Sequence, residues 1–397
     1  MPRPTPFHER LAKLNEAYAW KEWSGYYAAC RYETNHIYEY TAFRRSAGLL
    51  DVSPLFKYEV RGPDAARFLA YVTVRDATKL KVDRVGYCCW CDERGKIIDD
   101  GTLTRLGDEH FLLTAAEPTW RWLSHLARGF DVKLDDVSDR IAVLALQGPK
   151  SRDVLKACVQ GIDFETLTFF GSANGRLGAA PVRVSRTGYT GDLGYEIWCD
   201  NAHALPVFDA ITEAGRAYAL RVCGLDALDM TRVEAGFILL GVDYFSAPHC
   251  VRDERRSTPF EVGLGFTVQL GREPFMGSAA LEAEKKAGPK WELVGLETDW
   301  EDLERLYDAY GLPPSLPGQA SRVAVPVYLE GHRVGQATSH TWSPMLKRFI
   351  SLATVRADVA KPGTELKVEH TVEYDRRAVK ARVVQKPFYD PEHKRKP

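Results

Sequence analysis

Residues 186–197 form a glycine-rich segment whose residue types and spacing could build a binding loop. Three glycines and the carboxylate of Glu196 lie between two runs that read as strands. The glycines permit positive φ angles and let a flat ligand approach the backbone. A carboxylate among apolar neighbours is costly unless a group with hydrogen-bond donors meets it. The segment therefore predicts a site for a flat ligand with donors on its edge, and a plain hairpin with a surface glutamate is the alternative.

Two consecutive carboxylates, Asp99 and Asp100, lie in a strand-like run over residues 97–104. Successive side chains of a strand point to opposite faces, so one of the two can enter a pocket while the other cannot. A carboxylate in a pocket can take a proton or stabilise positive charge that develops on a nitrogen. Periodicity does not say which aspartate points inward, and a pair of surface aspartates beside a turn is the alternative.

Composition limits the classes of partner. The chain has 397 residues, 45% of them hydrophobic, which is enough for two or three packed units. Its 53 basic and 54 acidic side chains give a net charge of -1, which argues against wholesale binding of nucleic acid or an anionic membrane. No apolar run reaches the roughly 18 residues that a membrane span needs. We expect a soluble, cytoplasmic protein.

The cysteines give no metal signature. Cys88, Cys89 and Cys91 cluster in a strand-like run, but no second cysteine or histidine pair stands at metal-ligand spacing. We predict buried free thiols and no metal site.

The order of helical and strand-like runs predicts an α+β fold. Helices and strands alternate without the regular unit of a doubly wound sheet. Residues 11–20 predict a short helix, and beyond residue 290 closely spaced short strands are typical of a small barrel or sandwich. We expect one region over residues 1–278 and a C-terminal region over residues 291–390.

Several short motifs in a fixed order resemble one family. They are Gly-Leu-Leu-Asp-Val-Ser (48–53), Gly-Lys-Ile-Ile-Asp-Asp (95–100), Ala-Leu-Gln-Gly-Pro (145–149), the glycine-rich segment, Arg-Val-Glu-Ala-Gly (232–236), Lys-Pro-Gly-Thr-Glu-Leu (361–366) and Lys-Pro-Phe-Tyr (386–389). Together they span nearly the whole chain and resemble the glycine-cleavage T-protein (aminomethyltransferase) family of tetrahydrofolate-dependent one-carbon transferases. The resemblance implies two interleaved α/β subdomains that form a folate-binding region, followed by a small C-terminal β-barrel.

The same resemblance implies roles for two acidic residues, with tetrahydrofolate as cofactor. The second aspartate of the family's acidic motif is catalytic and lies near the reactive nitrogens of the folate; here it is Asp100. Glu196 matches the glutamate that binds the pteridine, whose 2-amino group and N3-H can both donate to one carboxylate.

Four further residues are expected near the folate. Thr114 and Ala115 end a strand that contacts the folate in relatives. Tyr87 and Tyr189 are expected to pack against the folate ring. Ordinary core packing is the alternative for the two tyrosines.

This chain departs from the family pattern on the substrate side. The family's helix carries an arginine that binds the substrate complex, four residues before the arginine of its Arg-x-Glu-Ala-Gly motif. That position is Leu228 here, and a leucine can neither pair with a carboxylate nor donate a hydrogen bond. Arg232 is present, and its place beside Glu234 allows a structural salt bridge. The ending Lys-Pro-Phe-Tyr-Asp-Pro resembles folate-dependent demethylases more closely.

These features predict an enzyme of the demethylase-like branch. It would move a methyl group from a small N-, O- or S-methyl compound to N5 of tetrahydrofolate. Tyr26 and Tyr244, together with Leu228, are candidate substrate-binding residues, because aromatic rings can hold an onium group or stack on a methoxylated ring. The alternatives are a glycine-cleavage aminomethyltransferase that acts on a lipoyl carrier protein, and a non-catalytic folate-binding regulator.

Overall fold

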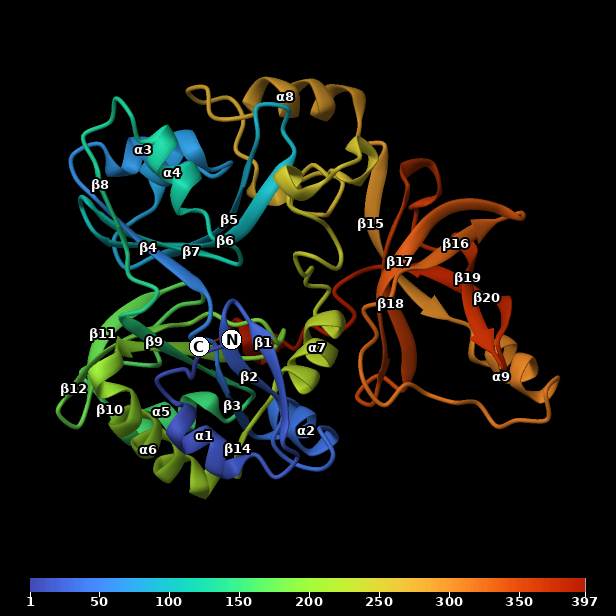
Figure 1. Ribbon diagram of the computed structural model, residues 1–397, viewed down its shortest axis with the longest axis horizontal. Coiled ribbons are helices and arrows are strands. Elements are labelled where there is room, and N and C mark those ends of the chain that lie inside the picture. Colours follow the sequence, from blue (N-terminus) through green and yellow to red (C-terminus); the bar gives the residue numbers. More distant parts are fainter. Residues whose placement is uncertain (397) are drawn as a thin grey trace. The chain divides into compact units, whose positions relative to one another are not determined.

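A computed structural model describes residues 1–396 of the chain (Figure 1). The described chain divides into two compact units. The first unit contains Met1–Trp90, Asp99–Thr231 and the residues from Asp390 onward, and the second contains Cys91–Ile98 and Arg232–Tyr389.

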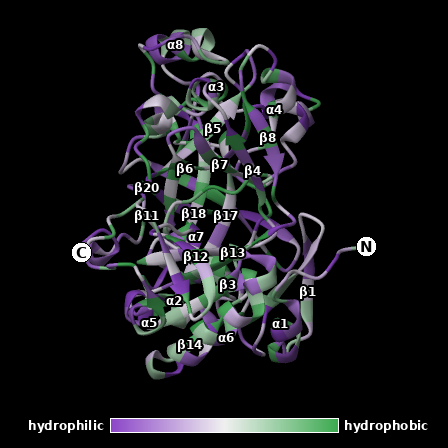
Figure 2. Ribbon diagram, turned by 90° about the vertical axis from the view of Figure 1, so that its left-hand side faces the viewer, coloured by the Kyte–Doolittle hydropathy of each residue, from purple (hydrophilic) through white to green (hydrophobic). Residues whose placement is uncertain are grey.

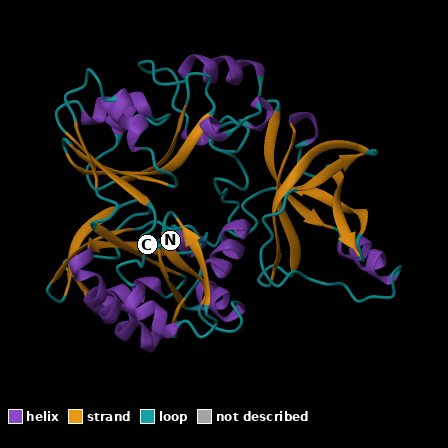
Figure 3. Ribbon diagram, in the orientation of Figure 1, coloured by secondary structure: helices purple, strands orange, loops and turns teal. Residues whose placement is uncertain are grey.

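The first unit is built on a seven-stranded sheet. In spatial order its strands are β10 (Val159–Gln160), β11 (Ser172–Leu177), β12 (Ala180–Ser185), β13 (Gly194–Asp200), β9 (Ile141–Gln147), β3 (Ala47–Asp51) and β14 (Leu220–Val222). The helices α5 (Ser151–Cys158) and α6 (Ala204–Gly215) contact each other and strand β13 (Figure 3). The other helices that begin in this unit are α1 (His8–Leu14), α2 (Ile37–Arg45), α3 (Ala65–Val72), α4 (Trp120–Leu126) and α7 (Leu225–Glu234).

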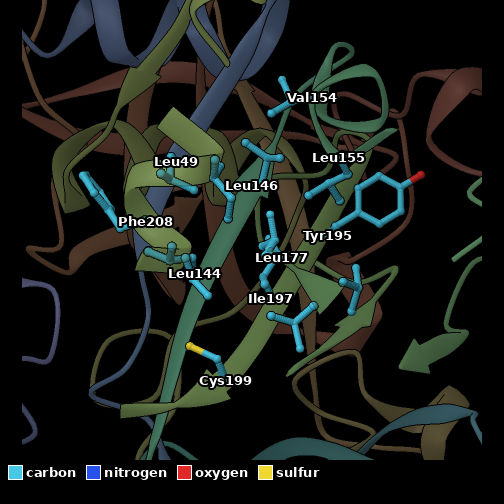
Figure 4. Packing of buried hydrophobic residues seen from close by; sticks show 14 of the residues in the cluster. Leu49, Leu144, Leu146, Val154, Leu155, Leu177, Tyr195, Ile197, Cys199 and Phe208 are labelled. Atoms are coloured by element: carbon cyan, nitrogen blue, oxygen red, sulfur yellow. The ribbon is translucent and has the colours of Figure 1, made fainter. Parts of the chain in front are cut away.

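Side-chain alternation on the central strands builds the main core of this unit. Leu144 and Leu146 are two residues apart on β9 and share a face of the sheet, as does Ile197 on β13 with its own neighbour Tyr195. All four are fully buried and pack in one cluster with Leu155 of α5 (Figure 4). The glycine-rich segment between β12 and β13 is therefore anchored to the most tightly buried part of the unit.

A second sheet carries the two aspartates. Its strands, in spatial order, are β5 (Val85–Cys91), β6 (Ile97–Gly107), β7 (His110–Ala115), β4 (Phe56–Arg61) and β8 (Lys133–Asp136). Strands β6 and β7 pair antiparallel, and the strand-like run predicted over residues 97–104 lies within β6. Cys88, Cys89 and Cys91 of β5 are buried thiols that are not part of a disulfide.

The C-terminal strands of the second unit close into a six-stranded barrel. In spatial order they are β15 (Trp291–Thr298), β18 (Arg348–Arg356), β17 (His332–Ser343), β16 (Val325–Leu329), β19 (Glu365–Val372) and β20 (Asp375–Val384). The same unit contains helices α8 (Ser278–Ala287) and α9 (Trp300–Asp308). The predicted α+β class with a small C-terminal β-barrel is confirmed.

The helix predicted over residues 11–20 is wrong in its second half. Helix α1 ends at Leu14, and residues from Ala19 form strand β1 (Ala19–Trp23), which pairs with β2 (Tyr26–Arg31). The aromatic side chains of this stretch favour a pleated ribbon, and pairing with β2 outweighs the helical signal of the preceding residues.

No helix of the described residues is long and apolar enough to cross a membrane. Helix α8, for example, carries hydrophilic and hydrophobic residues within ten positions (Figure 2).

The core of the seven-stranded sheet gives a stability prediction. Leu144→Ala should lower the free energy of unfolding by about 2–5 kcal/mol, because it removes buried methyl groups from a strand that is paired on both sides. Leu14→Ala is the matched control, since Leu14 is 45% exposed at the end of α1. Urea unfolding followed by circular dichroism measures both, and equal effects of the two changes would contradict this account of the core.

Candidate functional site

The glycine-rich segment forms a loop whose shape is set by Gln147. This residue ends strand β9, and its amide nitrogen donates to the main-chain oxygens of Thr187 (3.2 Å) and Tyr195 (3.3 Å). Its amide oxygen accepts from the hydroxyl of Thr190 at 3.0 Å. The buried carboxamide thereby supports both strand ends and the middle of the loop, which we call the glycine loop (residues 186–193).

The glycines of this segment serve two different needs. A Cβ atom at Gly188 or Gly194 would fall onto the side chain of Gln147, so both positions need the space that glycine leaves. Gly191 has φ +77°, a left-handed conformation that glycine adopts without strain. Close packing against Gln147 is therefore a reason for the glycines that the sequence pattern did not predict.

Glu196 lies on β13 opposite Ser185 of β12, at the mouth of the glycine loop. Its Oε2 atom accepts from the hydroxyl of Thr187 at 2.7 Å and from that of Ser185 at 3.4 Å. Trp198 Nε1 donates to Ser185 Oγ at 3.2 Å, and Ser185 and Thr187 share a bond of 2.7 Å. The indole, the two hydroxyls and the carboxylate thus form one connected hydrogen-bond network.

This arrangement leaves an acceptor available. Among the described residues, no partner contacts the second oxygen of Glu196, and the residue keeps partial exposure. Burial raises the pKa of Glu196, and the two hydroxyl donors oppose that shift. A carboxylate of this kind fits a ligand edge that presents hydrogen-bond donors, such as a reduced pterin.

Asp99 and Asp100 have different partners. The Asp99 carboxylate is fully buried and accepts from the main-chain N–H groups of Ala116 and Glu117, both at 3.0 Å, and of Asp100 at 2.7 Å. Burial, and then the neighbouring Asp100 charge, raise the pKa of Asp99, while the N–H donors lower it. Asp99 thus fixes the chain that follows β7.

Asp100 belongs to a polar group with two tyrosines. The Tyr87 hydroxyl, from the adjacent strand β5, donates to Asp100 Oδ2 at 2.5 Å. Burial, followed by the charge of Asp100, raises the pKa of Tyr87 well above its ordinary value, and Tyr189 of the glycine loop also contributes. Tyr87 therefore stays a neutral donor at physiological pH. Tyr87 and Asp100 are thus in direct contact, and Tyr189 is close enough to Tyr87 to influence its ionisation.

Thr114 and Ala115 lie at the buried end of β7. The hydroxyl oxygen of Thr114 accepts from the main-chain N–H of Thr102 at 2.8 Å, and Ala115 is 1% exposed. A Cβ atom at Gly101 would fall onto the main-chain oxygen of Thr114, so β6 and β7 approach closely beside Asp100. These positions shape the backbone next to the aspartate.

The three candidate substrate residues have different surroundings. Tyr26 is 8% exposed, donates to Asp139 at 2.7 Å and lies under the guanidinium of Arg3, 4.4 Å from the ring centre. Burial, and then this hydrogen bond, raise the pKa of Tyr26 to about 12. Tyr244 is 1% exposed and belongs to the other unit, whereas Leu228 is partly exposed on α7. A substrate role for each of them stays a prediction.

The arginine of the Arg-Val-Glu-Ala-Gly motif is paired inside the second unit. Arg232 Nη1 lies 2.6 Å from Asp243 Oδ2, both side chains are buried, and Arg232 also donates to Ser339 Oγ at 2.8 Å. Glu234 accepts from Ser343 Oγ at 2.5 Å. Arg232 therefore forms a buried salt bridge with Asp243, a partner that sequence spacing did not single out. The salt bridge with Glu234 that the spacing allowed stays a prediction.

Comparison with known proteins is consistent with this geometry. The family model described as GCVT N-terminal domain matches residues 6–272, and the glycine cleavage T-protein C-terminal barrel domain matches residues 311–390. The chain belongs to the glycine-cleavage T-protein family, whose members are tetrahydrofolate-dependent transferases.

Individual relatives carry different names. The chain is 35% identical to an aminomethyltransferase of Symbiobacterium thermophilum over 98% of both chains. It is also 35% identical to the trimethylamine-oxide aldolase of Ruegeria pomeroyi, over 100% of this chain but 48% of that protein. The crystal structure of aminomethyltransferase T from Bartonella henselae superposes with a TM-score of 0.82 at 25% identity, covering 98% of this chain and 99% of the other.

The Gln147 contacts give a prediction for the loop. Gly194→Ala should destabilise the fold by about 1–3 kcal/mol, because the new methyl group overlaps the buried carboxamide. Gly318→Ala is the control, since no atom lies within 4 Å of its Cβ position. Adding Gln147→Ala to Gly194→Ala should cost less than the sum of the two single changes in thermal unfolding. Additive losses would mean that the two residues do not compete for space.

Proposed function

We propose that this chain transfers a methyl group from a small N-, O- or S-methyl compound to N5 of tetrahydrofolate. The observation that carries the proposal is the Tyr87–Asp100–Tyr189 group in a family member that has leucine at position 228. The sequence keeps Asp100 and Glu196, the residues that the family resemblance assigns to the folate side, while the arginine that relatives use for their substrate complex is a leucine.

The residues of the acceptor side suit tetrahydrofolate. Glu196 offers its carboxylate to the donors of the pterin edge, and Tyr189 and Tyr87 offer aromatic faces beside Asp100. Bound there, tetrahydrofolate supplies the N5 atom that accepts the carbon unit and gives up a proton. Asp100, held by the Tyr87 hydroxyl, can accept that proton or stabilise positive charge on the nitrogen.

Where relatives bind their substrate complex with an arginine, this chain has an uncharged residue. Leu228 is partly exposed and can neither pair with an anion nor donate a hydrogen bond. A small methylated donor fits such a wall better than a complex that relatives hold with an arginine. The name of the Ruegeria pomeroyi relative contains an N-methyl compound, which favours N-methyl donors among the three classes. Aminomethyl transfer from a lipoyl carrier is the competing function, because the Symbiobacterium thermophilum relative is matched along 98% of its length.

Glu196→Gln should weaken tetrahydrofolate binding by about 2 kcal/mol, roughly thirtyfold in Kd. The amide replaces one carboxylate oxygen with an NH2 group, which would face an N–H donor of the pterin edge. The affinity of the unchanged protein should also fall as the pH drops through the raised pKa of Glu196, at a higher pH than for an ordinary glutamate near 4.3. The glutamine variant should lack this pH dependence. Isothermal titration calorimetry measures both effects, with Glu16→Gln as an exposed control. An unchanged Kd in a folded Glu196→Gln protein would remove Glu196 from the site.

A donor panel tests the function itself. The purified protein is given tetrahydrofolate with trimethylamine oxide, other N-methyl compounds, a methylsulfonium compound, a methoxylated aromatic compound, or an aminomethyl-lipoyl carrier protein. We expect 5-methyltetrahydrofolate, measured by mass spectrometry, from at least one small donor. Asp100→Asn should lower turnover about a hundredfold or more, while Asp108→Asn, whose side chain is 95% exposed, should not change it. Methylenetetrahydrofolate formed solely from the lipoyl carrier would overturn the proposal.

A further inference from the structure

The last described residues of the chain contact the glycine loop directly. We call residues 390–396 the C-terminal strap; they fold with the first unit. His393 Nε2 lies 2.7 Å from Asp192 Oδ1, near the end of the loop. At the start of the loop, Arg186 Nη2 donates to the main-chain oxygens of Lys394 (3.1 Å) and Lys396 (2.5 Å).

The buried guanidinium of Arg186 depends on the strap for its acceptors. Arg186 is 2% exposed, and burial lowers its pKa. In the described chain its acceptors are three main-chain oxygens, two from the strap and one from Leu167 at 3.1 Å. Removing the strap would leave a buried charge with one acceptor, which is costly, so the start of the loop would have to move toward water.

The other end of the loop is held by a chain of charged groups. The Asp192 side chain is fully buried, lies 3.7 Å from Arg44, and receives His393 on its other oxygen. Arg44 also donates to the main-chain oxygen of Thr190 at 2.9 Å. The strap therefore completes the set of contacts that fixes residues 190–192.

The strap has its own internal contacts, which give it a defined shape. Asp390 pairs with Arg395 at 2.8 Å and with Lys394 at 3.7 Å. Lys394 is 7% exposed and lies 6.0 Å from the ring centre of Phe169, and Arg395 lies 5.9 Å from the same ring. Arg152 donates to the oxygen of Lys396 at 3.1 Å. The match to the family's barrel domain ends at residue 390, so most of the strap lies outside the matched range.

Both fixed ends of the loop adjoin candidate folate contacts. Thr187, next to Arg186, donates to Glu196, and Tyr189 lies between the two anchored ends and beside Tyr87. We propose that the C-terminal strap is a positioning element that holds the glycine loop in its tetrahydrofolate-binding form. This inference rests on the proposed function only for the identity of the ligand. Loss of the strap loosens the loop and weakens binding, while the step at Asp100 keeps its rate once the ligand is bound.

The test compares the full chain with a variant that ends at Tyr389, with His393→Ala, and with a control, Glu304→Ala, at an exposed position of α9. Hydrogen–deuterium exchange without ligand should be faster over residues 186–193 in the truncated protein and in His393→Ala, but unchanged in Glu304→Ala. The Kd for tetrahydrofolate should rise at least tenfold on truncation and several-fold in His393→Ala, with kcat at saturating tetrahydrofolate within twofold. A peptide of residues 390–396 added to the truncated protein should restore both readouts.

Two results would overturn the proposal. One is unchanged exchange of residues 186–193 in folded His393→Ala and truncated proteins. The other is a loss of kcat with no change in Kd. Because the exchange measurement needs no ligand, it stands even if Glu196→Gln leaves folate affinity unchanged, so failure of the proposed function and failure of the strap are told apart. If the truncated chain does not fold, His393→Ala decides.

Discussion

One buried carboxamide organises the candidate site. Gln147 has no charge and lies among backbone groups, so each of its hydrogen bonds is needed to offset the cost of burial. These hydrogen bonds hold the end of β9, the glycine loop and the start of β13 in fixed positions. The side chain of Gln147 leaves no room for a Cβ atom at Gly188 or Gly194, which explains two of the three glycines. The position of Glu196, two residues beyond Gly194 on a paired strand, is a consequence of this packing.

In the second unit, buried charged side chains offset the cost of burial by binding one another and nearby hydroxyl groups. Arg232 and Asp243 are buried and would be destabilising alone, but Asp243 also accepts from Thr338 at 2.6 Å and Ser339 at 2.7 Å. The Glu234 carboxyl accepts a hydrogen bond from the Ser343 hydroxyl, which joins the end of α7 to barrel strand β17. The Arg-Val-Glu-Ala-Gly motif thus supplies two members, Arg232 and Glu234, whose buried polar partners lie far along the chain.

The sequence allowed prediction of the strands whose burial follows from local alternation of side chains. It did not allow prediction of the contacts between residues that are far apart in the chain. Strands β6, β7 and β13 and the barrel follow from period-two patterns and turn residues, and strand alternation separates Asp99 from Asp100. The role of Gln147 was missed, although a polar residue ending a buried apolar strand was a usable signal. The contact of His393 with Asp192 spans 201 positions, and no local pattern encodes it. Tyr26 was chosen for its aromatic ring, but its neighbours Arg3 and Asp139 are set by tertiary packing.

The two halves of a one-carbon transfer place different demands on the protein, and this chain treats them differently. In the function proposed above, the acceptor half needs a fixed acceptor for the pterin edge and a fixed carboxylate near the reacting nitrogen; the two residues proposed for these roles, Glu196 and Asp100, are both held by hydroxyl donors. Such preorganised groups do not depend on which molecule donates the carbon. The donor half sets specificity, and there the family's arginine position is a leucine. Replacing an arginine by a leucine changes which substrates can form hydrogen bonds in the site and which would lose hydrogen bonds to water on binding. Enzymes discriminate most strongly between substrates that differ in such hydrogen bonds. The family fold can therefore keep its folate chemistry while its donor changes, which is the physical reason to search for the substrate among small methylated compounds.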